Sequence, residues 1–390
     1  MSEIRKCQVL IIGAGPGGYV AAIRSAQLGL ETIVVEGDKP GGVCLNIGCI
    51  PSKAIIHAAE RYESLTKHSS ENGHMGISIN ENPEIDMKGV VEWKDGIVGR
   101  LTKGVETLVK SSGAELINGW ATFTSSKQCS VKTKEGEILI EAENVIIATG
   151  STHIDLPFMP CDEKFVLSST GALNLQKVPK KVAIVGGGYI GLELGCALSK
   201  LGSEVTVIEG MDSILAIMDK EIRRPLEIWL KKNKVTVHTN SLARGTKIKG
   251  KGASSKVELT FEKNSEEQKI IVDKVLVTVG RSPNSRGWGL ENMGIRMDTS
   301  GRFIRIDRQC RTSAPGVYAI GDVAGEPMLA HKASAQGEMV AEIISGEKRE
   351  FDKVAIPAIV FTEPEIVSVG LTPDEAEERG EEIITGKFPL

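Results

Sequence analysis

The sequence carries the same unit twice, and this repeat constrains the fold more than any other feature. The segments CQVLIIGAGPGGYVAAIRSAQLGLETIVVEG, from Cys7, and KKVAIVGGGYIGLELGCALSKLGSEVTVIEG, from Lys180, align without a gap. Each has an apolar run, a G-x-G-x-x-G turn, a segment of helical periodicity and a second apolar run that ends in Glu-Gly. A strand–helix–strand unit of this kind predicts a parallel sheet with helices on its faces, so we expect an α/β fold.

Both copies have the residue types that a dinucleotide-binding turn requires. The first glycine permits a tight turn, the second lets the backbone approach a pyrophosphate, and the third lets the helix pack closely on the strand. The helix N-terminus then faces the phosphates, and an acid at the end of the second strand binds a ribose hydroxyl. The residues in these positions are Gly13, Gly15, Gly18 and Glu36 in the first copy, and Gly186, Gly188, Gly191 and Glu209 in the second. Two such turns predict two bound dinucleotides.

The sequence outside the repeat gives the expected domain boundaries. Apolar runs end in glycine at Gly150 and Gly280, where we expect the chain to return from each nucleotide-binding unit. From about Val354 the pattern changes to short apolar runs with prolines between them, which indicates another domain. We therefore predict two Rossmann-like domains and the start of a third domain. The first consists of residues 1–150 and 280–353, the second of residues 151–279, and the third of residues 354–390.

Composition and charge exclude several classes of function. The formal net charge is -4, which provides no basic surface for nucleic acid or for an anionic membrane. We find no apolar run that approaches the length of a membrane span, and the N-terminal segment reads as a strand instead of a signal peptide. Seven cysteines, an odd number scattered along the chain, are not the pattern of a secreted disulfide framework. We expect a cytoplasmic protein without a metal site, in which five isolated cysteines have no special role.

Cys44 and Cys49 are close together in the sequence, within GGVCLNIGCIPSKAIIHAAERY. One interpretation of the pair is half of a zinc site, but the sequence has no second Cys/Cys or Cys/His pair of matching spacing. A second interpretation is two idle thiols. Pro51 suits the first turn of a helix that we expect to continue to about Tyr62, with Cys49 at or near its N-terminus. The helix dipole stabilises a thiolate there, so we favour redox chemistry.

A disulfide between these two cysteines would restrict the backbone that joins them. Residues five apart in a regular helix have Cα atoms roughly 8–9 Å apart, beyond the limit of about 7 Å for a disulfide. We therefore expect irregular backbone in residues 45–48 (LNIG). Gly41 and Gly42 are expected to let the chain run close to a flat ring system.

Three charged residues are further candidates for the site. Lys53 follows Cys49 by four residues on the same helix face, and Glu193 stands where the first copy of the repeat has Val20. The lysine could extend along the surface, and the glutamate could serve only the helix dipole; alternatively the two pair with each other. Asp322 ends the apolar run GVYAIGDV and has two compatible interpretations. It can cap the helix expected from about Met328, and it can hydrogen-bond the polyol chain of a cofactor.

Several motifs together resemble one known family. GAGPGGYVAAIRSAQLG, CLNIGCIPSKA, GGGYIGLELG, GRSPN, YAIGDV and PMLAHKA are similar to motifs of the pyridine nucleotide–disulfide oxidoreductases, and the resemblance extends from residue 4 to residue 390. Glutathione and mercuric reductases share the cysteine segment. PMLAHKA, with Ala330 and His331, is instead similar to the lipoamide branch, the dihydrolipoyl dehydrogenases.

The resemblance implies two cofactors and a role for each candidate residue. It implies FAD contacts at Gly13, Gly15, Gly18, Glu36, Lys53, Gly119, Asp322 and Ala330, and NAD contacts at Gly186, Gly188, Gly191, Glu209 and Gly280. Gly150 and Gly321 complete the expected cofactor-binding set. The resemblance also implies a Cys44–Cys49 disulfide in which Cys44 exchanges with substrate and Cys49 contacts the flavin. Lys53 is implied to lie near the flavin, paired with Glu193.

The implied activity is the oxidation of dihydrolipoyl groups to lipoyl groups, with NAD as the final hydride acceptor. The implied partners are lipoylated carrier proteins or domains of the 2-oxoacid dehydrogenase or glycine cleavage type, and full-length members are homodimers. Family members take their catalytic base from a C-terminal dimerisation domain, and this sequence stops at Leu390, early in that domain. The resemblance therefore implies that residues 354–390 are the start of an α+β interface domain, most of which we expect to be missing from this sequence. Two alternatives remain: an NAD(P)H-dependent reductase of another disulfide, and a flavoprotein without disulfide turnover.

Overall fold

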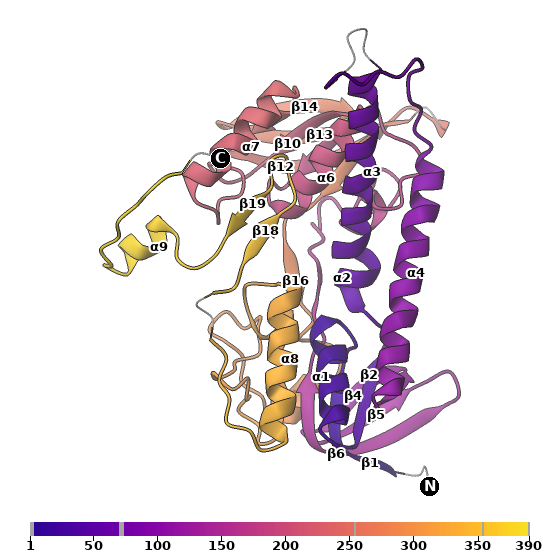
Figure 1. Ribbon diagram of the computed structural model, residues 1–390, viewed down its shortest axis with the longest axis vertical. Helices are drawn as coiled ribbons and strands as arrows, with labels where there is room; N and C mark the ends of the chain where they lie inside the picture. The colour runs from indigo at the N-terminus through magenta and orange to yellow at the C-terminus, as the bar shows by residue number, and fades with distance from the viewer. Residues whose placement is uncertain (1–3, 70–73, 253–254, 353–354, 389–390) are drawn as a thin grey trace. The chain divides into compact units, whose positions relative to one another are not determined.

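The computed structural model describes residues 4–69, 74–252, 255–352 and 355–388 (Figure 1). The chain forms two compact units, each assembled from segments that are distant in the sequence. The first unit is Met1–Ser52, Glu92–Ile154 and Arg281–Asp352, and the second is Lys53–Val91, Asp155–Gly280 and Lys353–Leu390. Each unit contains a sheet with parallel strands and helices against it, which confirms the expected α/β fold class.

The compact units differ in extent from the expected domains. Residues 53–91 belong to the second unit, whereas the sequence analysis grouped them with the N-terminal domain. Residues 353–390 also belong to the second unit. The assignment of one domain to each cofactor stays a prediction.

The first unit is built on a seven-stranded sheet. Its order is β3-β2-β1-β6-β5-β4, with β17 also paired to β6. Strands β3, β2, β1, β6 and β17 are parallel, and β4 and β5 form an antiparallel extension. The strands are β1 (Ile4–Ile12), β2 (Thr32–Glu36), β3 (Glu115–Asn118), β4 (Trp120–Ser125), β5 (Gln128–Lys132), β6 (Glu137–Ile147) and β17 (Val317–Ala319). A short ribbon joins β7 (Ser151–His153) to β16 (Arg281–Pro283).

Two helices pack very closely beside this sheet. Helix α1 (Pro16–Gln27) lies along α8 (Ala330–Ile344), as Figure 1 shows. A Cβ on Gly337 of α8 would overlap the backbone oxygen of Gly17 in α1, so the two helices approach at a distance that only glycine allows. The other helical segments of this unit are α2 (Gly42–Ile47), most of α4 (Met87–Ser111), and the 3₁₀ turns η2 (Leu290–Met293) and η3 (Gly321–Ala324).

The second unit contains the second copy of the repeat in a five-stranded parallel sheet. The strand order is β11-β10-β9-β15-β8. These strands are β8 (Val166–Leu167), β9 (Lys181–Val185), β10 (Glu204–Ile208), β11 (Thr236–His238) and β15 (Lys274–Val277). The helices of this unit include α5 (Ser169–Ala172), α6 (Tyr189–Lys200), α7 (Lys220–Lys232) and α9 (Pro373–Glu378).

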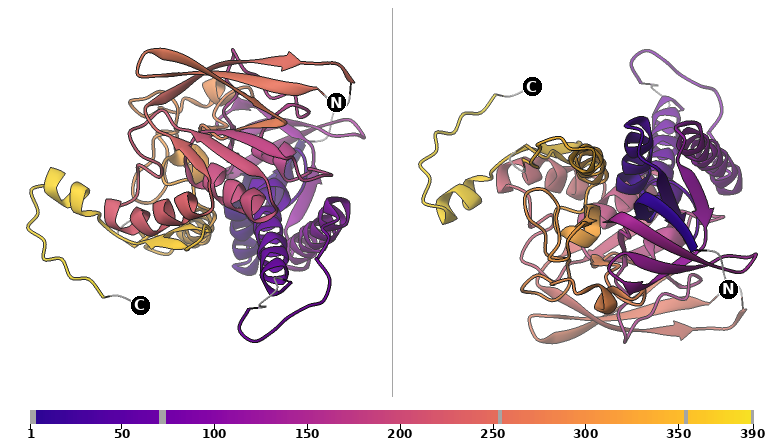
Figure 2. Two further views of the ribbon diagram at one scale, coloured as in Figure 1. Left: turned by 90° about the horizontal axis from the view of Figure 1, so that it is seen from above. Right: turned by 90° about the horizontal axis from the view of Figure 1, so that it is seen from below.

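Two antiparallel sheets complete the second unit. The longer one has the order β12-β13-β14 and is visible as extended salmon strands in Figure 2. The shorter one is the pair β18-β19. Their strands are β12 (Ser241–Lys249), β13 (Lys256–Lys263), β14 (Glu266–Val272), β18 (Ala358–Val360) and β19 (Ile366–Ser368).

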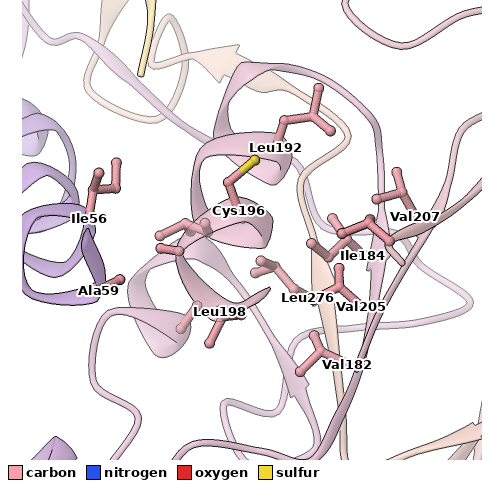
Figure 3. Packing of buried hydrophobic residues seen from close by; sticks show 14 of the residues in the cluster. Ile56, Ala59, Val182, Ile184, Leu192, Cys196, Leu198, Val205, Val207 and Leu276 are labelled. Atoms are coloured by element: carbon pink, nitrogen blue, oxygen red, sulfur yellow. The ribbon is translucent and has the colours of Figure 1, made fainter. Parts of the chain in front are cut away.

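Helix α6 is buried on both sides in the core of the second unit (Figure 3). Leu192, Cys196 and Leu198 of α6 are all less than a tenth exposed. The labelled residues of the sheet beside α6 are Val182, Ile184, Val205, Val207 and Leu276. On the other side lie Ile56 and Ala59 of α3 (Cys49–His68). Because α6 packs between a sheet and a helix, its backbone position is closely fixed.

Helix α3 is longer than expected and begins at Cys49. It ends at His68, not near Tyr62, and the division between the two units falls within it, after Ser52. Among the described residues, the helical stretch 42–68 is long and apolar enough to cross a membrane, judged by its length and composition alone. This was not predicted from the sequence. Core helices can meet the same criterion, and this stretch consists of two helices, α2 and α3, separated at Gly48.

Candidate redox site and nucleotide-binding turns

The first glycine turn joins β1 to α1 and has no room for side chains at two of its positions. Gly13 has φ +97°, a conformation that favours glycine. A Cβ on Gly13 would overlap the backbone oxygen of Ala148, and a Cβ on Gly18 would overlap that of Gly13. Gly15 is the N-cap of α1 and makes no side-chain cap bond. The turn therefore exposes backbone at a helix N-terminus, which is the arrangement that binds a pyrophosphate.

Glu36 closes this turn from the end of β2. Its carboxylate accepts hydrogen bonds from the backbone N–H of Ala14, at 2.7 Å, and of Asp38, at 2.9 Å. Burial raises the pKa of Glu36 above its ordinary value, although the backbone hydrogen bonds act in the opposite direction. Gly119, which the resemblance implied as a cofactor contact, follows β3 and donates its N–H to the backbone oxygen of Glu36 at 2.9 Å.

The second glycine turn, between β9 and α6, repeats this geometry. Gly186 has φ +102°, and a Cβ on Gly191 would overlap the backbone oxygen of Gly186. Gly188 is the N-cap of α6. The carboxylate of Glu209 accepts hydrogen bonds from Gly187, at 2.5 Å, and from Met211, at 2.7 Å. Both turns thus fit a dinucleotide: an open helix N-terminus, a backbone that a larger residue would block, and an acid beside the turn.

Helix α2, which carries Cys44, begins against the first glycine turn. Gly41 and Gly42 have φ +98° and +58°. A Cβ on Gly42 would lie 2.6 Å from the Cα of Gly15. Gly42 is therefore required by the contact of two backbones, whereas a Cβ on Gly41 would lie 2.8 Å from the side chain of Leu45. The expected approach of both glycines to a ring system stays a prediction.

The disulfide between Cys44 and Cys49 is present, with a Cα–Cα distance of 4.6 Å. The expected break in the helix is shorter than predicted. Leu45, Asn46 and Ile47 remain helical in α2, and only Gly48 departs, with φ -135° and ψ -111°. A Cβ on Gly48 would lie 2.8 Å from the backbone oxygen of Val43, so this single residue has to be glycine to bring the cysteines together.

Lys53 and Glu193 form the expected ion pair within the second unit. Lys53 Nζ lies 2.8 Å from Glu193 Oε2, and the glutamate side chain is only 5% exposed. Glu193 Oε1 accepts the backbone N–H of Phe361 at 3.0 Å, and Lys53 Nζ lies 4.2 Å from the centre of the Phe361 ring. Glu193 therefore has partners for both oxygens. The alternatives, a lysine extended along the surface and a glutamate that only favours the helix dipole, do not describe this pair.

Near that pair is a cluster of charges that the sequence did not indicate. Lys200 Nζ lies 3.0 Å from Glu363 and 3.3 Å from Glu60, and the lysine side chain is only 3% exposed. Burial alone would lower the pKa of Lys200, but the two glutamates outweigh it and raise the pKa. The cluster joins α3, α6 and the segment after β18, which also contains Phe361. The sequence contains one weak indication of this cluster, since Lys200 lies two helical turns after Glu193.

Asp322 does not cap a helix, contrary to one of its two interpretations. It lies in η3, and α8 begins later, at Ala330 with Leu329 as its N-cap. The Asp322 carboxylate accepts the Ser151 hydroxyl instead. Arg281 donates to the Ser151 hydroxyl at 2.8 Å and to its backbone oxygen at 2.6 Å. The sequence analysis missed both Ser151 and Arg281.

The remaining expected glycines lie at the ends of strands or in turns. Gly150, with φ +68°, separates β6 from β7 and accepts the backbone N–H of Asn284 at 2.9 Å. Gly280, with φ +120°, follows β15. Gly321, with φ +72°, donates its backbone N–H to the Gln336 side chain at 2.9 Å. Gln336 is a further residue that the sequence analysis missed.

The other cysteines have the environment of structural thiols. Cys7, Cys129, Cys196 and Cys310 are buried, and Cys161 is half-buried. Burial raises the pKa of Cys7, Cys129, Cys161 and Cys196 to about 12. A thiol with such a pKa is protonated at neutral pH and a poor nucleophile. This agrees with the expectation that only Cys44 and Cys49 are reactive.

Comparison with known proteins identifies the family. The model of the pyridine nucleotide-disulphide oxidoreductase family matches residues 7–337. A dihydrolipoyl dehydrogenase of Pseudomonas aeruginosa is 47% identical, over 100% of this chain and 82% of that protein. One of Bacillus subtilis is 48% identical, over 98% of this chain and 79% of that protein.

Solved structures give the same result. The structure of LpdA from Mycobacterium tuberculosis superposes with a TM-score of 0.86 at 26% identity, covering 95% of this chain and 80% of that one. The flavoprotein disulfide reductase RclA from Escherichia coli superposes with a TM-score of 0.80 at 27% identity, covering 95% of this chain and 79% of that one.

The chain belongs to the pyridine nucleotide-disulphide oxidoreductase family. The expectations of an enzyme, of a flavoprotein with a redox-active disulfide, and of FAD and NAD as its cofactors are confirmed. Within the family, the curated relatives named above are dihydrolipoyl dehydrogenases, as PMLAHKA indicated.

Proposed function

We propose that the chain acts as a dihydrolipoyl dehydrogenase on lipoylated carrier proteins. The electron pair of a dihydrolipoyl group passes to the Cys44–Cys49 disulfide, then to FAD, and finally to NAD. The observation that carries the proposal is the disulfide itself. It joins Cys49, at the start of α3, to Cys44 in α2, and α2 begins against the first glycine turn. The dihydrolipoyl dehydrogenases at 47% and 48% identity support this substrate over the disulfides of other reductases.

The two glycine turns are assigned to the two cofactors. Gly13, Gly15 and Gly18 would hold the pyrophosphate of FAD, and Glu36 its ribose; Gly186, Gly188, Gly191 and Glu209 would do the same for NAD. When bound, the flavin accepts an electron pair from thiols and gives it to nicotinamide as hydride. Further contacts are proposed for Lys53, Gly119, Gly150, Gly321, Asp322 and Ala330 with FAD, and for Gly280 with NAD.

We assign the two sulfurs of the disulfide different roles in the exchange. A thiolate of the substrate attacks Cys44 Sγ, a mixed disulfide forms, and Cys49 leaves as a thiolate. The second substrate thiol then attacks its own neighbouring sulfur, which closes the lipoyl ring and releases Cys44. The substrate loses two electrons and two protons, and the disulfide gains the two electrons. One proton ends on the Cys44 thiol, and the other passes to solvent when the attacking thiolate forms. Cys49 is the first residue of α3, so the free N–H groups and dipole of the helix stabilise its thiolate.

Lys53 has a positively charged ammonium group, and Glu193 fixes its position. Lys53 lies one helical turn after Cys49, and Glu193 holds its ammonium group at 2.8 Å. Because Phe361 occupies the other oxygen of Glu193, the carboxylate cannot rotate freely. We propose that this charge favours the anionic forms that arise during electron transfer.

The partners and setting are proposed from the same relatives. The partner is a lipoylated carrier protein or domain of the 2-oxoacid dehydrogenase or glycine cleavage type. The chain is proposed to work in the cytoplasm and to form a homodimer.

The test measures NAD reduction by the purified protein with dihydrolipoamide and with a lipoylated carrier domain. Cys44→Ser and Cys49→Ser should each abolish it. Cys161→Ser, at a half-buried cysteine outside the disulfide, is the control and should keep full activity. Glutathione disulfide with NADH or NADPH tests the alternative reductase. Turnover of glutathione disulfide without oxidation of dihydrolipoamide would overturn the substrate assignment.

A further inference from the structure

Helix α2, which carries Cys44, is too short to be stable without help. It has six residues, Gly42–Ile47, and its N-cap Gly41 provides no side-chain bond. Helices of this length are unstable in water, because the few hydrogen bonds they form do not offset the cost of ordering the backbone. The disulfide attaches α2 to α3 while it is closed. The proposed function requires the disulfide to open in each cycle, so something else must then hold Cys44 near Cys49.

Asn46 lies between the two cysteines in the sequence, and both the nitrogen and the oxygen of its side-chain amide form hydrogen bonds. Its amide nitrogen donates to the backbone oxygens of Pro40 and Gly42, each at 3.0 Å, and lies 3.4 Å from that of Lys39. Its oxygen accepts the hydroxyl of Thr102, on α4, at 2.9 Å. The side chain thus connects the turn before α2 to a long neighbouring helix. All of these residues belong to the first unit.

We propose that Asn46 and Thr102 are positioning residues that hold α2 in place when the disulfide is reduced. The inference rests on the proposed function only in that the disulfide opens and closes during turnover. Asn46 fixes the N-terminal end of α2 to the preceding turn, and Thr102 fixes Asn46 to α4. Cys44 therefore stays near Cys49 as a free thiol, and the disulfide can re-form without a search through other conformations of α2.

The proposal predicts a direction for the thiol–disulfide equilibrium. In the exchange with dithiothreitol, the reagent loses two electrons and two protons and closes its own ring, while Cys44 and Cys49 become two thiols. In the oxidised protein the disulfide restrains α2 whether or not Asn46 is anchored. In the reduced protein, loss of the anchor frees α2 and adds conformations, which favours the reduced form. The variant disulfide should thus be easier to reduce.

The chain provides a matched set of variants on α4. Thr102→Val removes the hydroxyl and keeps the shape, and Thr102→Ser keeps the hydroxyl. Thr107→Val makes the same change five residues further along α4, where the Thr107 hydroxyl donates to the Lys103 carbonyl of its own helix, at 2.8 Å. The holoprotein is equilibrated with mixtures of reduced and oxidised dithiothreitol, then alkylated. Mass spectrometry of the peptides gives the fraction of reduced Cys44 and Cys49.

We expect Thr102→Val to shift the equilibrium toward the dithiol by about three- to tenfold, the range for one lost hydrogen bond. A tenfold shift corresponds to about 30 mV in a two-electron couple. Thr102→Ser should restore the equilibrium to within about twofold, by the same measure, and Thr107→Val should leave it unchanged. Asn46→Ala should shift it further than Thr102→Val.

Two outcomes overturn the proposal: an unchanged equilibrium in Thr102→Val, and an equal shift in Thr107→Val. Thermal unfolding of the oxidised and reduced forms separates a general loss of stability from the proposed role. A general loss lowers both midpoints equally and leaves the equilibrium unchanged, which also counts against the proposal. No dihydrolipoyl substrate is used, so failure of the proposed substrate would leave this result intact.

Discussion

The two copies of the repeat have almost the same turn and quite different surroundings. Gly13 and Gly186 have φ +97° and +102°, and in both turns the residue after this glycine donates its N–H to the glutamate, Glu36 or Glu209. What covers the helix differs. Gly17 of the first copy lies so close to α8 that a Cβ would be 3.1 Å from the backbone oxygen of Ala333, whereas the second copy has Ile190 at this position.

This difference explains how the same strand–helix–strand unit has a different role in each copy. In the first copy the turn lies against Gly42, so the helix of Cys44 begins beside the proposed FAD site. In the second copy Glu193 replaces Val20, and its buried carboxylate holds Lys53. The glycine turn is therefore the constant part, and the residues packed around it supply the chemistry.

The largest effect is expected from adding a methyl group separately at each of the two proposed pyrophosphate sites. Gly15 and Gly188 occupy the same place, with φ -71° and -78°, which alanine adopts readily. A Cβ on Gly15 would meet only the Cα of Gly42, at 3.8 Å, and a Cβ on Gly188 would meet no described atom within 4 Å. Alanine at either position should therefore preserve the fold and obstruct the pyrophosphate.

We expect Gly15→Ala to weaken FAD binding by at least about a hundredfold, or ~2.7 kcal/mol. Gly188→Ala should keep its full complement of FAD and lose NADH binding to a similar extent. Flavin absorbance, reconstitution with FAD, and the NADH concentration dependence of flavin reduction provide the measurements. If each variant weakened both cofactors equally, the assignment of one copy to each cofactor would be wrong.

The next prediction concerns the buried carboxylate that distinguishes the second copy. Glu193→Gln keeps the shape and the bond from Phe361 but removes the charge that Lys53 faces. We expect the free energy of unfolding to fall by about 1–3 kcal/mol. Glu204→Gln is the control, since it breaks the 2.8 Å pair with Lys181, in which both side chains are more than half exposed.

The exposed pair should contribute less than about 1 kcal/mol. Chemical denaturation of the three proteins at one pH and salt concentration gives the comparison. Equal losses in Glu193→Gln and Glu204→Gln would mean that burial adds nothing to the pair with Lys53, and the copies would differ less than the structure indicates.

The third prediction concerns coenzyme choice in the second copy. Glu209 ends β10, and residues 210–212 (GMD) include no arginine or lysine. A carboxylate there accepts hydrogen bonds from a ribose diol and repels a 2′-phosphate. We expect kcat/KM to favour NAD over NADP by at least about tenfold, or ~1.4 kcal/mol. Glu209→Gln should reduce that preference, because the amide lacks the charge. Equal kinetics with the two coenzymes in the unmodified protein would contradict the assignment.

The sequence predicted those features in which residue type and geometry determine each other. The first and third glycines of both turns are required by backbone contacts, so their spacing indicated the fold and the likeness of the two copies. The disulfide and the pairing of Lys53 with Glu193 were implied by the resemblance to the family, since the residues alone left alternatives open. The break at Gly48 was only partly predictable, because the sequence does not reveal that Leu45–Ile47 stays helical.

Contacts between residues distant in the sequence could not be predicted. Thr102 bonds to Asn46 across 56 residues, Arg281 to Ser151 across 130, and Lys200 to Glu363 across 163. No local pattern connects such residues, since each occupies an ordinary position on its own helix or strand. The interpretation of Asp322 as a cap was wrong for a related reason: it depended on where α8 begins, and helix ends are set by packing as much as by sequence.

The smallest effect is expected from the titration of Glu36 in the first copy. Burial raises the pKa of Glu36 above its ordinary value of 4.5, so at pH values between these two the folded protein keeps a proton that the unfolded chain has lost. The free energy of unfolding should therefore fall as pH rises through that interval and stay level above it.

In Glu36→Gln this contribution is absent, while the amide oxygen can still accept the Ala14 N–H. Thermal midpoints of both proteins, with the same excess of FAD and from pH 4.5 upward, give the difference. We expect the unmodified protein to lose stability relative to Glu36→Gln with rising pH. A relative gain would mean that the backbone hydrogen bonds to the carboxylate outweigh its burial.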